Sequence, residues 1–339
     1  MIQEKHIGLT YFLVHALVEI VCFSILYDKY GLGISFTVAL FFDYFAFVPQ
    51  AIIGELNHRF RKLDIGSIGV VLMSIGIFVS VHSNPSIALT GICILAFGNC
   101  MLHEAGAIAT VTVSKGKLFP SALFVSGGSF GLVLGQIIGS IGINRIFLLI
   151  LMLIIELLVL LSNKYWKEPF PLPEFSLTKE NHSSWFVITI AFGVTAVRSF
   201  LGYAIPMLWK QEVWQTVLLF FIMGFGKAAG GYFSDRIGAR KTAVWSTLLS
   251  IPFLLIGNKI MLISIVGVCL FSATMSITFG ALLSVIKNNP GLAFGVTTLA
   301  LFVGVVPVLI WGTFGTLIDS ILVVALSLVC AFYLNKTLK

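Results

Sequence analysis

The chain has 339 residues, of which 58% are hydrophobic and only 10% are charged, and its formal net charge is +7. A soluble globular domain carries roughly 25% charged residues, so this composition excludes an ordinary soluble protein. The apolar runs are long and do not alternate, which predicts transmembrane helices rather than the strands of a membrane barrel. The basic residues lie in short connectors and form no large basic face, so we expect no nucleic-acid partner.

Apolar runs separated by polar breaks predict an all-α membrane protein with twelve transmembrane helices. The predicted spans are residues 7–27, 34–54, 65–81, 86–110, 120–142, 145–162, 184–206, 214–231, 243–257, 260–285, 292–311 and 317–335. The first run is too long for the core of a typical signal peptide, so we expect the first helix to be retained.

The first two spans carry ionisable residues at membrane depth. His15 and Glu19 are four residues apart and therefore share one face of a helix. At about 1.5 Å per residue from Ile7, Glu19 lies roughly 18 Å deep, near the middle of a core about 30 Å thick. Asp43 is similarly central in the second span. Because charges inside a bilayer are costly, these residues are candidate functional sites.

The fourth and fifth spans carry two further patterns. By helix rise, His103 and Glu104 lie roughly 26 Å from the outer end of the fourth span, so we expect them near the cytoplasmic surface, solvated or lining a gate. In the fifth span, glycines at every fourth position leave one helix face without side chains, so that another helix backbone can approach. These are Gly127, Gly131, Gly135 and Gly139.

The longest polar connector, residues 163–183, lies near the middle of the chain. Pro169, Pro171 and Pro173 stand at alternate positions there, and such prolines hold the backbone extended. We therefore predict an N-terminal six-helix bundle over residues 1–162, a cytoplasmic linker over 163–183 and a C-terminal six-helix bundle over 184–339.

The distribution of Lys and Arg predicts the orientation in the membrane. If the N-terminus is inside, fifteen of the 21 basic residues fall in inner connectors or at the inner ends, and four fall outside. Lys5 and Lys62 are among the inner residues, and Arg198 and Lys227 are left within spans. By the positive-inside rule, both termini are cytoplasmic. We expect a monomer in a bacterial inner membrane.

A charged stretch follows the eighth span, between two very apolar runs. It reads Gly231-x-x-Ser234-Asp235-Arg236-x-Gly238-x-Arg240-Lys241, with Lys227 about two turns earlier. A similar stretch from Gly54 to Lys62 follows the second span, and Gly231 lies 177 residues beyond Gly54, close to half the chain. Paired repeats of this kind build the substrate sites of many secondary transporters at the bilayer midplane.

These stretches, the span count and the central linker resemble the major facilitator superfamily, over essentially the whole chain. The resemblance implies alternating access, with spans 1, 4, 7 and 10 lining a central cavity that would hold His15, Glu19 and Arg198. It also implies a cytoplasmic gate formed by Asp235, Arg236, Arg240 and Lys227. The first-half stretch departs from the pattern at Asn57, where an acid is usual, so the gate role is carried over mainly to the second-half stretch.

Within this resemblance we assign candidate roles and keep their alternatives open. Glu19 is the main candidate for proton coupling, because substrate and proton can compete for a carboxylate in an apolar cavity. His15 and Asp43 are further candidates for the same role. Arg198 is a candidate for binding an anionic group or the Glu19 carboxylate. The alternatives are permanent structural pairs, Glu19 with Arg198 or His15 with Asp43. Lys227 has the alternative of reaching to the membrane interface.

A finer resemblance favours export. Phe97-Gly98-Asn99 leading to His103-Glu104, the glycine run of the fifth span, and Val197-Arg198-Ser199-Phe200 followed by Pro206 resemble drug exporters of the fosmidomycin-resistance type. The glycine run also resembles the antiporter motif of the superfamily, except that Gln136 stands where that motif has proline. Tight helix packing is the alternative explanation of the glycines.

The predicted function is proton-coupled export of a drug-like or anionic compound, with a small solute, protons and the lipid bilayer as partners. A proton- or ion-coupled importer of a metabolite is the first alternative, and a non-transporting receptor or scaffold is the second. The sequence contains no Walker-type loop and no zinc or nucleophile constellation, so we expect neither an enzyme nor a cofactor. The five cysteines all lie in apolar runs and predict buried thiols.

Overall fold

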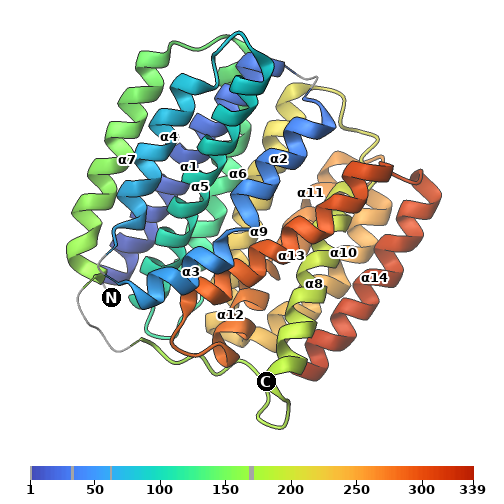
Figure 1. Cartoon of the computed structure of the whole chain (residues 1–339). Helices are drawn as coiled ribbons and strands as arrows, with labels where there is room; N and C mark the ends of the chain where they lie inside the picture. Colours follow the sequence, from blue (N-terminus) through green and yellow to red (C-terminus); the bar gives the residue numbers. More distant parts are fainter. Residues whose placement is uncertain (1, 32–33, 62, 168–171) are drawn as a thin grey trace.

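The structure is a computed structural model that describes residues 2–31, 34–61, 63–167 and 172–339, without the side chains of residues 2–5 and 165 (Figure 1). The predicted contributions of Lys5 and Lys62 to the orientation, and of Pro169 and Pro171 to the linker, therefore lie outside the described residues.

The described chain forms fourteen α-helices. In chain order they are α1 (Ile2–Tyr30), α2 (Phe36–Phe47), α3 (Gln50–Arg59), α4 (Ile65–Val79), α5 (Pro85–Thr112), α6 (Phe119–Ser140), α7 (Arg145–Trp166), α8 (Ser184–Ala204), α9 (Val213–Ile237), α10 (Ala239–Gly257), α11 (Met261–Ser272), α12 (Met275–Val285), α13 (Pro290–Trp311) and α14 (Thr316–Thr337).

The helices account for the twelve predicted spans. Within the described ranges, ten segments are long and apolar enough to cross a membrane, with α2 joined to α3 and α11 joined to α12. The apolar α4 has 15 residues and α10 has 19, with Pro252 inside it. The prediction of an all-α membrane protein with twelve helical spans is confirmed.

Two of the predicted spans are interrupted. The second breaks between α2 and α3, where Pro49 precedes the first residue of α3, because proline has no N–H to donate and its ring crowds the preceding turn. The tenth breaks between α11 and α12 at Ala273 and Thr274, and no proline lies at this break. There, Nη2 of Arg198 donates a hydrogen bond of 2.6 Å to the carbonyl oxygen of Phe271, near the end of α11.

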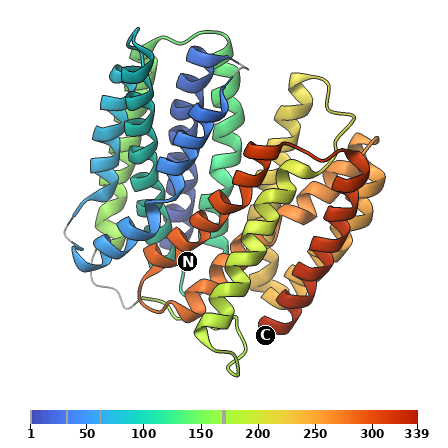
Figure 2. The same cartoon turned by 45° about the vertical axis from the view of Figure 1, so that its right-hand side comes forward.

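The helices are arranged in two bundles, α1–α7 and α8–α14, whose chain termini lie at the same end (Figures 1 and 2). The bundles meet mainly through two helix pairs, α6 with α9 and α3 with α13, and α13 also contacts α2 and α5. We call these two pairs the termini-side closure. At the edge of the closure farther from the chain termini, aromatic rings pack between the bundles. The ring centres of Phe130 on α6 and Phe221 on α9 are 4.8 Å apart, and those of Tyr44 on α2 and Phe302 on α13 are 5.9 Å apart.

Helices α1 and α6 pack backbone against backbone inside the first bundle. A Cβ atom added at any of the four spaced glycines of α6 would collide with a main-chain oxygen of α1. The paired residues are Gly127 with Phe12, Gly131 with Ala16, Gly135 with Ile20, and Gly139 with Ser24. Four-residue spacing on both helices therefore creates one continuous seam of close approach.

The outer surface is apolar, as a lipid environment requires. On α7, Leu153, Leu157 and Leu160 are exposed, whereas Leu148 and Ile155 are buried against the bundle. The exposed stripe has no polar side that would suit water, so it fits contact with hydrocarbon chains.

The connector between the bundles is helical at its start, because α7 continues to Trp166 and takes in the first residues of the predicted linker. The part described after residue 171 follows the termini end of the second bundle. The Lys179 N–H donates to the Thr337 carbonyl at 3.0 Å, and the Leu177 N–H donates to Ser284 Oγ at 3.1 Å.

Candidate functional site

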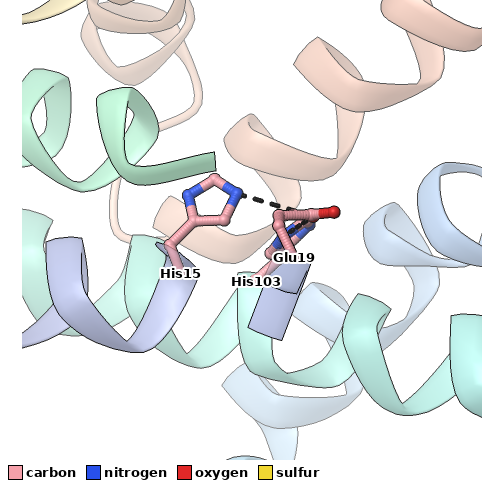
Figure 3. Close-up of side chains that lie close together, drawn as sticks. All are labelled: His15, Glu19 and His103. Atoms are coloured by element: carbon pink, nitrogen blue, oxygen red, sulfur yellow. Dashed lines mark ion pairs between the residues drawn. The ribbon is translucent and has the colours of Figure 1, made fainter. Parts of the chain in front are cut away.

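Three ionisable side chains converge inside the first bundle. His15 and Glu19 project from the same face of α1, and His103 projects from α5 toward them (Figure 3). Glu19 Oε1 lies 3.0 Å from His103 Nε2 and 3.8 Å from His15 Nε2. All three residues are more than nine-tenths buried. We call this the His–Glu–His cluster.

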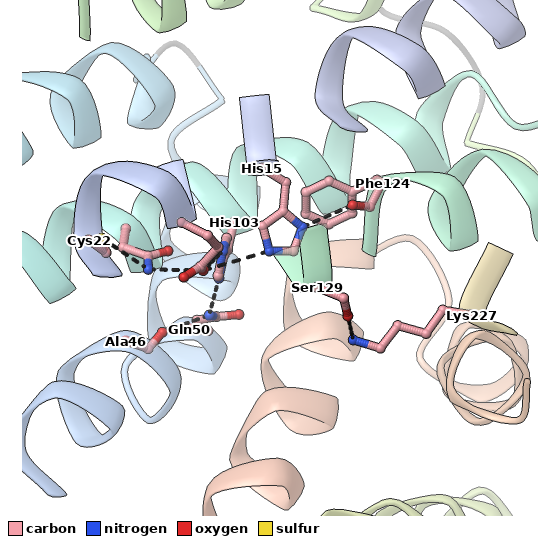
Figure 4. A network of polar contacts seen from close by, with 10 residues as sticks. His15, Cys22, Ala46, Gln50, His103, Phe124, Ser129 and Lys227 are labelled. Atoms are coloured by element: carbon pink, nitrogen blue, oxygen red, sulfur yellow. Dashed lines mark hydrogen bonds and ion pairs between the residues drawn. The ribbon is translucent and has the colours of Figure 1, made fainter. Parts of the chain in front are cut away.

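Surrounding polar groups fix the orientation of both imidazole rings (Figure 4). His15 Nδ1 lies 2.9 Å from the Phe124 carbonyl oxygen, which can only accept, so Nδ1 carries a hydrogen. In the neutral ring, the lone pair of His15 Nε2 then faces Glu19.

The orientation of His103 follows from Gln50. The Gln50 amide nitrogen donates to the Ala46 carbonyl at 2.7 Å, which fixes the amide, and it lies 3.4 Å from His103 Nδ1. His103 Nδ1 is therefore an acceptor in the neutral ring, and its Nε2–H faces Glu19.

The three potential ligand atoms of the cluster lie within 4.8 Å of one another, a spacing that one metal ion could bridge. A metal ion needs an unprotonated nitrogen from each imidazole. His15 offers such a nitrogen, but the Gln50 amide leaves the hydrogen of His103 on the nitrogen that faces Glu19. The residues therefore fit an acid–base cluster better than a metal centre.

Two residues to which the sequence analysis assigned no role in a site, Asn99 and Gly128, help to build the cluster. Asn99, four residues before His103 on α5, donates its amide N–H to Glu19 Oε1 at 3.2 Å. Gly128 of α6 faces the His15 ring, and a Cβ there would collide with His15 Nε2. The four-residue spacing of Asn99 and His103 is a signal that could have placed both on one face of α5.

Of the two alternatives for His103 and Glu104, solvated or gate-lining, the first is wrong. Both side chains are buried, and His103 contacts Glu19. Helix rise gives the position along one helix, whereas the crossing of α1 and α5 decides which residues meet.

The alternative of a structural ion pair between Arg198 and Glu19 is not formed among the described residues. Arg198 instead binds the Phe271 carbonyl, and its guanidinium lies 5.0 Å from the centre of the Phe271 ring. Its Nε has no hydrogen-bond partner among the described residues. Asp43 is half-buried on α2 and interacts electrostatically with Glu19 and Tyr203 rather than pairing with His15.

Lys227 crosses from one bundle to the other. Its Nζ donates to Ser129 Oγ of α6 at 2.8 Å (Figure 4). It interacts electrostatically with Glu19 and Arg198, so the three groups share one electrostatic environment. Lys227 therefore neither joins Asp235 nor reaches to the membrane interface.

Asp235 connects the bundles at the termini-side closure. Its two carboxylate oxygens accept the backbone N–H groups of Leu118 and Phe119 at 2.8 and 2.9 Å, at the start of α6. A carboxylate at a helix N-terminus is favoured by the helix dipole and by the unpaired N–H groups there. Arg236 and Arg240 stay within the second bundle, where they contact the Tyr232 ring and Asn335.

The other half of the closure is built differently. Glu55 of α3 accepts a hydrogen bond of 2.7 Å from the Asn289 amide, just before α13, and Gly54 packs on the backbone of Gly291. Asn57 donates to the Leu63 carbonyl of its own bundle instead of reaching α13. The start of α13 is instead capped from within its own bundle, by Asn289, whose Oδ1 accepts the Leu292 N–H at 3.0 Å.

Comparison with known proteins defines the class of fold. No family model and no curated protein sequence matches the chain. Solved structures do match over nearly the whole length, and three of them are transporters with the major facilitator superfamily fold. The chain therefore has this fold and is an integral membrane protein.

Three solved structures illustrate the match. The human organic anion transporter MFSD10 aligns with a TM-score of 0.69 at 14% identity, covering 98% of this chain and 99% of that one. FucP in the outward conformation aligns with a TM-score of 0.62 at 17% identity, covering 98% of this chain and 99% of that one. A single-residue variant of the E. coli fucose:proton symporter FucP aligns with 0.63 at 15%, covering 98% of each chain. At these identities the likeness concerns the fold.

Proposed function

We propose that the protein is a secondary transporter that moves a small solute by alternating access. The observation that carries this proposal is the termini-side closure, in which the two bundles meet through glycine contacts, aromatic contacts and a few hydrogen bonds. A rocking motion can break contacts such as Asp235 with the start of α6 and Glu55 with Asn289, and form others at the opposite end.

Proton coupling at the His–Glu–His cluster is the second part of the proposal. With His15 neutral, its Nε2 lone pair and the Glu19 carboxylate face each other at 3.8 Å, and a proton added to either group would turn this contact into an attractive one. The charge of Glu19 acts electrostatically on Asp43 and Lys227, which would respond when that charge changes. Arg198 keeps an unpaired Nε donor for an anionic group of the solute.

Export of a drug-like or anionic compound is the proposed direction, supported by the resemblance of the fourth, fifth and seventh spans to fosmidomycin-resistance exporters. The excess of basic residues at the termini end supports cytoplasmic termini, in a monomer in a bacterial inner membrane. In that orientation the structure is closed toward the cytoplasm. The domain boundaries at residues 162 and 184 are part of the same proposal, as the two bundles would rock about the linker.

Import of a metabolite with protons is the second candidate. FucP, one of the similar structures, is a fucose:proton symporter, and Gln136 stands where the antiporter motif of exporters has proline. The direction of solute movement under an imposed pH gradient separates import from export. A receptor or scaffold would bind a ligand without moving it.

The test begins with a thermal-shift screen of the purified protein against drugs and metabolites at two pH values, because a ligand that binds the folded state raises its stability. A stabilising compound is then assayed in proteoliposomes. We expect flux driven by a pH gradient, and we expect Glu19→Gln to abolish it while solute exchange without a gradient continues.

Glu156→Gln is the matched control, because Glu156 of α7 is also a membrane-embedded carboxylate but bonds Ser67, at 2.8 Å. Unchanged gradient-driven flux in Glu19→Gln would remove Glu19 from the coupling mechanism. Binding of a compound without any flux would support a receptor.

Arg198→Ala should abolish binding of an anionic solute. Unchanged binding would contradict the proposed role of Arg198.

A further inference from the structure

A second buried carboxylate lies at the termini-side closure. The Glu104 side chain on α5 is completely buried. Neither of its carboxylate oxygens has a hydrogen-bond partner among the residues that the structure describes. This contrasts with Glu19, which is surrounded by imidazole and amide groups.

The start of α13 covers Glu104 from the second bundle. A Cβ added at Gly291, in the first turn of α13, would lie 2.9 Å from Glu104 Oε2, and it would also meet the backbone of Gly54 on α3. Gly291 is thus placed between Glu104 and α3. The burial of Glu104 depends on a segment that must move away if the closure opens.

The ionised form of Glu104 does not suit this closed arrangement. A buried carboxylate without a hydrogen bond or a cationic partner is strongly disfavoured, and the dipole at the start of α13 offsets only part of that cost. The protonated carboxyl is far less costly to bury. Once α13 withdraws, water can solvate the carboxylate and the proton can leave.

We propose that Glu104 is a proton-binding site linked to the termini-side closure. The closed arrangement holds the proton, and opening releases it on the side of the chain termini. By reciprocity, protonation of Glu104 favours closure and loss of the proton favours opening. This inference rests on the proposed alternating access, because it needs α3 and α13 to separate.

Some of the helices that pack against α5 carry titratable groups and others carry none. Helices α4, α6 and α13 contain none in their sequences, whereas α1 carries His15 and Glu19 at membrane depth and α2 carries Asp43. On α5, Cys100 lies one turn before Glu104 and His103 is its neighbour in the chain. On α3, Glu55 binds Arg59 and Asn289, and His58 stands one turn further on. The site of proton binding can therefore be assigned by single substitutions.

The experiment measures the width of the closure as a function of pH. Spin labels are attached through Phe60→Cys and Lys287→Cys, two exposed positions next to α3 and α13, in a protein whose native cysteines are replaced. Distance distributions are recorded by electron–electron double resonance in nanodiscs from pH 5 to pH 9. One linked proton can shift the ratio of closed to open forms by up to about tenfold per pH unit.

We expect the open form to gain population as the pH rises. Glu104→Gln, which mimics the protonated carboxyl, should stay closed at every pH, whereas Glu55→Gln and Glu156→Gln should retain the pH dependence. A Glu104→Gln variant with the original pH dependence would overturn the proposal. A label-to-label distance that does not change with pH in the labelled protein that retains Glu104 would also overturn it. If this labelled protein still transports solute, only this inference fails. If it shows no flux either, the proposed alternating access fails too.

Discussion

At the scale of single residues, the His–Glu–His cluster depends on groups that hold its rings in place. The Phe124 carbonyl fixes one imidazole and the Gln50 amide fixes the other, so that different hydrogen-bonding atoms face Glu19. Protonation of Glu19 or His15 would therefore change the contacts inside the cluster.

Gly128→Ala tests the fit of His15 in the cluster. The added Cβ would collide with the imidazole, displace it from Phe124 and separate it from Glu19. Loss of one such hydrogen bond, worth about 1.4 kcal/mol, should lower gradient-driven flux roughly tenfold relative to solute exchange without a gradient. Gly202→Ala is the control, because nothing lies within 4 Å of a Cβ there. An unchanged flux ratio in Gly128→Ala would show that the position of His15 does not matter for coupling.

Asp64 offers a prediction about pH that does not depend on transport. Partial burial raises the pKa of this carboxyl, but the Lys167 ammonium at 2.8 Å, the Ser67 N–H and the Asn163 amide outweigh burial and hold the pKa below its ordinary value. The ionised form therefore stabilises the folded state above the ordinary pKa of about 3.9, and this contribution is lost as the pH falls through the folded-state pKa.

Asp64→Asn should accordingly lower the free energy of unfolding by about 1 kcal/mol or less at pH 7, since the pair is partly exposed to screening solvent. The difference from the parent protein should shrink below about pH 4. Thermal unfolding in detergent at several pH values checks this. A difference that grows toward low pH would contradict the account.

At the scale of helices, the seam between α1 and α6 brings two backbones into close contact inside the first bundle. Gly131→Ala would place a methyl group against the Ala16 carbonyl, and overpacking of this kind should destabilise the protein by about 1–3 kcal/mol. Gly193→Ala, on a helix face with nothing within 4 Å, should be neutral or stabilising by up to about 1 kcal/mol. Equal unfolding temperatures for the two variants would show that the seam does not need its glycines.

Most helices could be predicted from the sequence because long apolar runs have few alternatives to a membrane span. The break at Pro49 had a visible signal that the span prediction passed over, whereas the break at Ala273 has none, because it involves Arg198 from another helix. Likewise, the spacing of His15 and Glu19 was visible in the sequence. Their contact with His103 was not, because a single sequence does not show how α1 and α5 cross.

At the scale of the whole molecule, the two bundles meet through pairs of helices that start or end at the closure. The start of α6 is capped by Asp235, whereas the start of α13 rests on Gly54 and covers Glu104. Opening this end would break a handful of polar contacts and separate glycine surfaces, while each bundle keeps its own core. The account therefore requires that solute movement depends on this opening.

Cross-linking the closure tests that requirement most directly. Glu55→Cys and Asn289→Cys replace two side chains that hydrogen-bond across the bundles at 2.7 Å, and a short, cleavable thiol cross-linker can join them. Flux of the compound found in the thermal-shift screen is measured before cross-linking, after it, and after cleavage of the linker, with Glu55→Cys alone as the control. We predict that cross-linking stops flux in the double variant and that cleavage restores it. Undiminished flux through the fully cross-linked protein would contradict transport by alternating access.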